Sequence, residues 1–220
     1  MDAASIEAHY PTVMHSLIGR LSAASSLLTQ IDENKEHREN WLRLDSVALQ
    51  VRKVCELIVL GSTLAHLQEG TELDPKHWHP KDAFKELEKF NQHPLPMPLQ
   101  LYISVDEHGA KQFVPAMKPI PLLALNRVYG QCANILHVPS AQKVLEEQVV
   151  PFEWAKYRSW VDDLVRVTRS HALLLPSIQS LIVCRWSGVC GEDPEITMAS
   201  GIGEAVLDAE NLADFDLLSA

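Results

Sequence analysis

The length, composition and charge of the chain exclude several protein classes before any motif is considered. Its 220 residues include 46% hydrophobic and 22% charged residues, which is typical of a globular protein with a substantial core. The formal net charge of −10 at pH 7 argues against a broad surface for DNA or RNA, because affinity for phosphates comes largely from clustered Lys and Arg. A local basic groove stays compatible with this charge.

The N-terminal sequence predicts neither export nor insertion into a membrane. "MDAASIEAHYP" carries carboxylates where a signal peptide has Lys or Arg, and no uncharged apolar stretch reaches the roughly 20 residues of a membrane span. We therefore expect a cytoplasmic protein. The cysteines are too few for a disulfide scaffold and are expected to be reduced thiols: Cys55, Cys132, Cys184 and Cys190.

The first part of the chain predicts two long amphipathic helices and a short one. Apolar residues recur at spacings of three and four over residues 3–31 and again over 36–68, the pattern of helices that bury one face. The short polar connection "DENK" between them favours an antiparallel hairpin. A third helix is predicted over residues 81–91.

The next stretch is rich in proline and predicts extended chain. Six of the thirteen prolines fall between residues 94 and 121, and proline lacks the N–H that a continuous helix needs. Alternating apolar residues from Leu99 to Val105, the turn sequence "DEHG" and the returning "KQFV" predict a small β-hairpin over residues 99–115.

The remaining elements complete the predicted fold. Helices are expected over residues 122–137, 141–148 and 152–171, and "SLIVCRW" with "EITMAS" predicts a second hairpin over 180–199. The fold class that follows is mainly α (α+β): a helical bundle with a small β-hairpin insert and a C-terminal β-hairpin. We expect residues 1–199 to form a single domain.

The last segment, residues 200–220, is acidic and apolar. Its final 17 residues hold five carboxylates and no Lys or Arg. Two interpretations stay open: a last helix folded back on its own domain, or a tail that orders on a protein partner. For the second, the candidate partner-binding residues are the large apolar ones: Leu207, Leu212, Phe215 and Leu218.

The search for local catalytic and metal-binding motifs is mostly negative. The chain has no P-loop, HExxH, GxSxG or CxxC sequence. "SGIGEAV" lacks the third glycine of a dinucleotide-binding turn. His77 and His79 in "DPKHWHP" could share a metal ion, but they have no evident third ligand and are more simply explained as solvated loop residues. We expect no cofactor and no metal.

The segment "RVTRSH" combines a cation with a group that can transfer protons. Arg166 and His171 have the spacing of a helical RNase motif, in which His moves the proton and Arg stabilises the charged phosphorane. On a regular helix, positions five residues apart point about 140° away from each other. The two side chains converge only if the helix bends or ends there.

The segment "RVYGQCANILH" is the other candidate site. Tyr129, Cys132 and Leu136 fall on one helical stripe with His137 at its edge, which is the pattern of a core face. Tyr129 and His137 could support a catalytic site. The alternative is that both form hydrogen bonds within the bundle.

The helix at residues 41–66, the irregular proline-rich stretch and "YGQCANILH" together resemble uncharacterised bacterial proteins of the HEPN-like helical group, over roughly residues 36–171. The resemblance implies an up-and-down helical bundle, frequent dimerisation and a place in toxin–antitoxin or phage-defence systems, where some relatives are metal-independent RNases. We expect a protein that works by association, as a homodimer or as a regulatory or structural subunit. The alternative is an endoribonuclease that uses Arg166 and His171, although the net charge disfavours RNA.

Overall fold

The structure is a computed structural model that describes residues 4–32, 38–68, 80–91, 93–100, 104–105, 111–112, 115–136, 153–176, 179–187 and 193–200. Several predictions of the sequence lie outside these residues. They are the helix over 141–148, the histidines His77, His79 and His137, Cys190, and the acidic segment with its Leu207, Leu212, Phe215 and Leu218.

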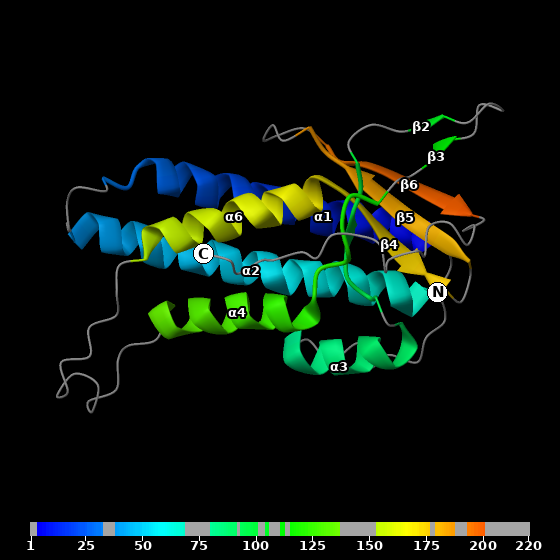
Figure 1. The fold of residues 1–220 in the computed structure, drawn as a ribbon, viewed down its shortest axis with the longest axis horizontal. Helices are drawn as coiled ribbons and strands as arrows, with labels where there is room; N and C mark the ends of the chain where they lie inside the picture. Colours follow the sequence, from blue (N-terminus) through cyan, green and yellow to red (C-terminus); the bar gives the residue numbers. More distant parts are fainter. Residues whose placement is uncertain are drawn as a thin grey trace.

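The helices form a bundle around a long central helix, as the apolar periodicity predicted. Their bounds are α1 (Ala4–Thr29), α2 (Arg38–Gln68), α3 (Pro80–Phe90), α4 (Leu122–Leu136) and α6 (Trp154–Arg169). Helices α1 and α2 form the expected antiparallel hairpin, and α2 also contacts α3, α4 and α6 (Figure 1). None of the described helices is long and apolar enough to cross a lipid bilayer.

Helix α2 is the centre of the core because its apolar stripe is completely covered. Val47, Val51 and Val54 have no exposed surface, and they belong to a cluster that includes residues of α1, α4 and α6. A polar contact adds to this packing: Arg52 of α2 lies over the ring of Tyr129 on α4 and donates a hydrogen bond to its hydroxyl at 2.9 Å. Tyr129 therefore helps to hold two helices together.

A small antiparallel sheet packs against one end of the bundle. Its strands, in the order β1-β4-β5-β6, are β1 (Met97–Pro98), β4 (Ser170–Leu175), β5 (Ser180–Arg185) and β6 (Glu195–Ser200). The pairing of β5 with β6 confirms the predicted C-terminal hairpin. Strands β2 (Ser104–Val105) and β3 (Lys111–Gln112) form the predicted hairpin insert.

One predicted boundary is wrong. The helix expected over residues 152–171 ends at Arg169, and Ser170 to Leu175 form strand β4. The run "HALLL" has residues that suit a helix, but β4 pairs with β1 on one side and β5 on the other, and all six of its residues are buried. Tertiary pairing therefore overrides local propensity at this point.

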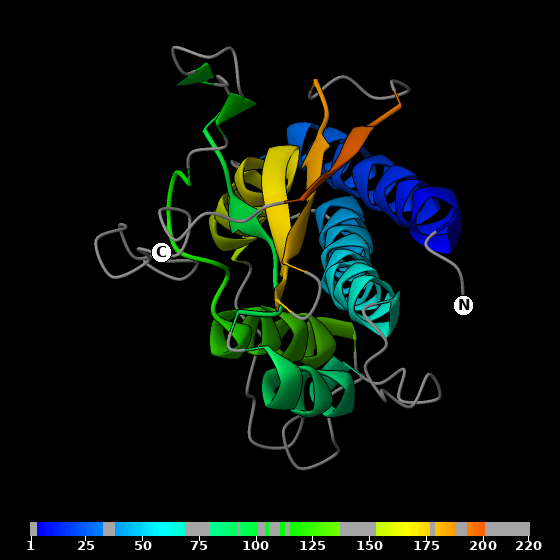
Figure 2. The ribbon, with the colours of Figure 1, turned by 90° about the vertical axis from the view of Figure 1, so that its right-hand side faces the viewer.

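The sheet has two buried faces, because successive side chains of a strand point to opposite sides. The first face carries His171, Leu173 and Ile182 and packs into the helical core, with α1 and α2 along that side (Figure 2). The second face is a separate apolar cluster: Met97, Leu99, Ala172, Leu174, Leu181 and Val183.

Candidate functional site

The structure places Arg166 and His171 in different environments. His171 lies on the first face of the sheet and has no exposed surface. Its Nδ1 lies 2.9 Å from the carbonyl oxygen of Thr168 and its Nε2 lies 2.8 Å from the hydroxyl of Tyr10 on α1. Since a carbonyl only accepts, Nδ1–H donates to Thr168 and Nε2 accepts from Tyr10. Both ring nitrogens are thus used inside the core.

The electrostatics of this buried pair do not suit proton transfer near neutral pH. Burial lowers the pKa of His171 to about 4, although the carbonyl of Thr168 partly opposes this shift. Burial likewise raises the pKa of Tyr10. His171 is neutral at pH 7, and no lone pair of its ring points to solvent. We conclude that it joins α1 to the sheet in this structure.

A second buried histidine repeats the arrangement. His66 of α2 donates through Nδ1 to the carbonyl of Ser62 at 2.7 Å, and its Nε2 accepts from the side-chain amide of Asn91 at 2.9 Å. The same amide nitrogen of Asn91 donates to the carbonyl of Leu174 at 3.1 Å. Burial lowers the pKa of His66 as well. Both ring nitrogens of His66 are therefore used in hydrogen bonds inside the core.

The "RVYGQCANILH" segment forms a core face of α4, as its periodicity indicated. Cys132 is fully buried, and burial raises the pKa of its thiol to about 12, which disfavours the nucleophilic thiolate. Cys55 and Cys184 are also buried free thiols with raised pKa values. Tyr129 binds Arg52, and the structure does not describe His137, so no joint site of the two can be built.

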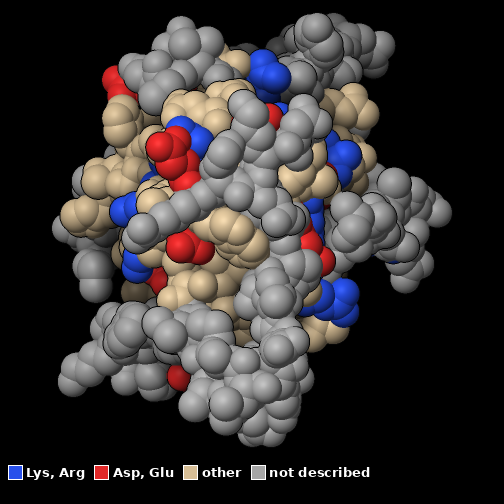
Figure 3. Space-filling model, turned by 90° about the vertical axis from the view of Figure 1, so that its left-hand side faces the viewer, with Lys and Arg blue, Asp and Glu red and all other residues tan. Residues whose placement is uncertain are grey.

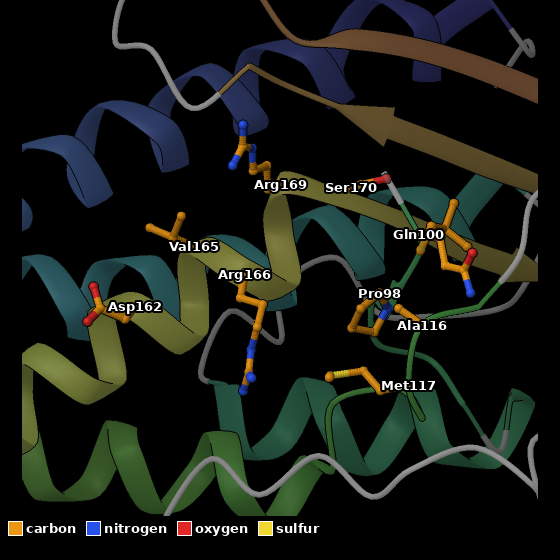
Figure 4. A pocket seen from close by; sticks show the side chains of 10 residues that line it. Pro98, Gln100, Ala116, Met117, Asp162, Val165, Arg166, Arg169 and Ser170 are labelled. Carbon is orange, nitrogen blue, oxygen red and sulfur yellow. The ribbon is translucent and has the colours of Figure 1, made fainter. Parts of the chain in front are cut away.

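Arg166 lines a groove of about 390 Å³ between the end of α6, β1 and the segment around Met117. We call this the α6–β1 groove; its lining residues are Pro98, Leu99, Gln100, Ala116, Met117, Asp162, Val165, Arg166, Arg169 and Ser170. Arg166 is half exposed and forms an ion pair with Asp163 at 2.7 Å. In Figure 4 the side chains of Arg166 and Arg169 project from the end of α6 in opposite directions.

Two buried polar atoms at this end of the sheet have no partner. Within the part of the chain that the structure describes, the hydroxyl of Ser170, a residue only 2% exposed, makes no hydrogen bond, and neither does Nε of Arg185. Ser170 and Arg185 are opposite each other on β4 and β5, so both point to the same side of the sheet. Such groups are rare in proteins because leaving one unsatisfied costs about 1–3 kcal/mol.

Two arginines near the groove, Arg169 and Arg185, donate hydrogen bonds to backbone carbonyls. Arg169 donates to the carbonyl of Ser187 at 2.8 Å, and Arg185 donates to that of Gln100 at 3.4 Å. Within the described ranges, neither arginine has a carboxylate within ion-pair distance. A guanidinium has five N–H donors, so each retains donors for an anion. The groove thus combines an apolar floor with two arginines, the hydroxyl of Ser170 and one carboxylate, that of Asp162.

Two further observations bear on catalysis and nucleic-acid binding. No group of three potential metal ligands occurs among the described residues. On the face seen in Figure 3, Lys and Arg are interspersed with Asp and Glu and do not form a basic patch.

Comparisons with known proteins give no information about this groove. No family model, curated protein or solved structure matches this chain.

Sequence reasoning found Arg166 but missed Arg169, Ser170 and Arg185. The only available signal was the spacing of Arg166 and Arg169, which places two cations in the last turn of one helix. The role of Ser170 and Arg185 depends on the pairing of β4 with β5, and β4 was expected to be helix.

Proposed function

We propose that the protein works by association and that the α6–β1 groove binds an acidic, apolar segment of a protein partner. The observation that carries this proposal is the exposed guanidinium of Arg169, which has no carboxylate within ion-pair distance among the described residues, in a groove with an apolar floor. A carboxylate of the ligand would accept hydrogen bonds from the N–H groups of Arg169 that the Ser187 carbonyl leaves unused, while an apolar side chain of the ligand packs on Met117 and Val165.

A protein segment suits the groove better than a nucleic acid. None of the ten lining residues is aromatic, so the groove offers no ring on which a base could stack. The net charge of −10 also repels a polyanion. Catalysis by Arg166 and His171 has little support, because His171 is buried on the first face of the sheet while Arg166 lines the groove.

The biological setting that we propose comes from the resemblance to HEPN-like proteins. It is that of a regulatory or structural subunit of a bacterial toxin–antitoxin or phage-defence system, acting as a homodimer or with a second protein. The groove is the surface through which such a subunit would bind its partner.

Binding of three labelled peptides to the 220-residue protein tests this function. The acidic peptide contains Asp and Glu interleaved with Leu and Phe. The basic peptide has Lys at each acidic position, and the polar peptide has Ser at each Leu and Phe. We expect only the acidic peptide to bind, and Arg169→Gln to weaken its affinity about tenfold, or about 1.4 kcal/mol. Arg127→Gln, a change at an exposed arginine of α4 outside the groove, is the matched control and should leave affinity unchanged.

Two results would overturn the proposal. One is equal binding of the acidic and basic peptides. The other is RNA cleavage by the wild-type protein that His171→Ala abolishes in a variant that remains folded, which would establish the endoribonuclease instead.

A further inference from the structure

Helix α2 has exposed leucines on the side that does not face the core. Among the described residues, the exposed large hydrophobic side chains are Leu42, Leu49, Leu60 and Leu123. The first three belong to α2 and are 57%, 43% and 45% exposed. A single exposed leucine is common on a protein surface, so the relative positions of these three decide whether they form a surface of their own.

The spacing of these leucines places them on one line along the helix. Leu49 follows Leu42 by seven residues and Leu60 follows Leu49 by eleven, which are close to two and three full turns. A further seven residues lead to the half-buried Leu67. Two charged residues occupy the same line between Leu49 and Leu60. We call this line the α2 stripe; its residues are Leu42, Leu49, Lys53, Glu56, Leu60 and Leu67.

Neighbouring helices border the α2 stripe without covering it. On one side of the stripe, Gln50 accepts a hydrogen bond from Arg20 of α1 at 2.9 Å. On the other side, Arg52 binds the hydroxyl of Tyr129 on α4. Figure 2 shows α1 and α4 on different sides of α2. The exposed leucines therefore lie between two helices that already have their own contacts with α2.

The α2 stripe has the same pattern of leucines when it is read from either end. This is what packing against an antiparallel second copy requires, because a two-fold axis repeats every contact. With the axis between residues 54 and 55, Leu49 lies opposite Leu60 of the second copy. Leu42 then lies opposite Leu67 of the second copy. The leucines of the stripe are thus complementary to themselves.

The charges at the centre of the stripe are complementary in the same arrangement. Lys53 lies opposite Glu56 of the second copy, and within each chain these two residues form an ion pair at 2.6 Å. Two copies together would form a closed network of alternating charges. A parallel pair would instead place lysine on lysine, and an antiparallel shift of seven residues would place Lys53 opposite Leu49. The charges therefore favour a second copy in one register.

We propose that the α2 stripe is the interface of a homodimer, in which α2 packs antiparallel on α2 of a second copy. From Leu42 to Leu67 the stripe extends about 38 Å. An interface of one helix face is at the low end of specific protein interfaces, so the dissociation constant should be on the order of micromolar. The stripe shares no residue with the α6–β1 groove. The inference thus goes beyond the proposed function, because it assigns self-association to a second surface.

Two variants with opposite changes of charge test this interface. Lys53→Glu leaves only acidic groups at the centre of the dimer, and Glu56→Lys leaves only basic groups. Each variant, with its fold checked by circular dichroism, should self-associate at least about tenfold more weakly than the wild type in analytical ultracentrifugation. An equimolar mixture of the two should form dimers again, because opposite charges then face each other.

The matched control for the charge changes lies on α3. Lys89 forms the same kind of ion pair with Glu86, three residues earlier, at 2.6 Å. Lys89→Glu should therefore leave the dimer intact.

A second test does not depend on the charged residues. Leu49→Ser/Leu60→Ser removes leucine contacts at two exposed positions and should make the protein monomeric. Leu123→Ser, at the 74% exposed leucine of α4, is the control and should leave the dimer intact.

Three outcomes would overturn the inference. They are a wild-type protein that stays monomeric up to about 100 μM, a dimer that the changes in the stripe leave unaffected, and a mixture of the two charge variants that stays monomeric. If the wild type is monomeric but the acidic peptide still binds, only this inference falls. If the dimer forms through the stripe but no peptide binds, only the proposed function falls.

Discussion

Arg166 and His171 are five residues apart, yet they occupy contrasting regions of the molecule. The Arg166 side chain is 55% exposed and lines a groove together with Arg169. His171 has no exposed surface, and both of its ring nitrogens have partners. The difference shows that a residue pair with catalytic spacing can be divided between a structural role and a binding role when a helix becomes a strand between its members.

The largest expected effect is on the structural side of this comparison. His171→Ala should lower the free energy of unfolding by about 3 kcal/mol, because it leaves a cavity and a buried Tyr10 hydroxyl without its partner. Urea denaturation followed by circular dichroism measures the change. His9→Ala, at an exposed position of α1, is the control. A loss under about 1 kcal/mol for His171→Ala would mean that the pair is not structural.

The second effect is a pH dependence of stability. The pKa of His171 falls from 6.5 to about 4 on folding, so between these values the unfolded chain binds a proton that the folded chain does not. Stability therefore rises with pH across this window and is lost as the pH falls from about 6.5 to 4, by on the order of 3 kcal/mol. His66 shifts in the same direction.

Unfolding free energies from pH 7 to pH 4 check this dependence. The slope should become smaller in His171→Gln and stay the same in His9→Gln. An unchanged slope in His171→Gln would show that other groups produce it.

A smaller effect distinguishes two helical glycines. A Cβ on Gly61 would lie 3.1 Å from Cε2 of Tyr10, whereas a Cβ on Gly19 meets nothing within 4 Å. Gly19→Ala should stabilise the protein by about 0.5–1 kcal/mol through helix propensity. Gly61→Ala should lose most of that gain, because the new methyl crowds the ring that binds His171. Equal stabilisation by both changes, measured by thermal unfolding, would argue against tight packing at Tyr10.

The smallest effect on stability is expected on the groove side. Asp163→Asn removes the partly exposed ion pair with Arg166, and pairs open to solvent contribute about 0–1 kcal/mol. The unfolding free energy should therefore change by at most about 1 kcal/mol. A larger loss would mean that this pair supports the fold. Arg166 would then have a structural role, as His171 does.

The helices were predictable from the sequence, but the site was not. The apolar stripes of α1 and α2 predicted their bounds to within two residues, because helix periodicity is a local property. Strand β4 was missed because its identity depends on pairing with β1 and β5, residues far away in the chain. The predicted catalytic pair failed to converge for the same reason, since the turn from helix to strand at Ser170 directs His171 into the core.

Reversing the charges of the groove and its ligand tests the central claim most directly. The variant Arg166→Glu/Arg169→Glu, with its fold checked by circular dichroism, is titrated with the acidic and basic peptides beside the wild type. The wild type should bind only the acidic peptide, and the variant should bind the basic peptide more tightly than the acidic one. Unchanged preference for the acidic peptide, or loss of both peptides in the folded variant, would contradict the assignment of this groove as a site for an acidic partner.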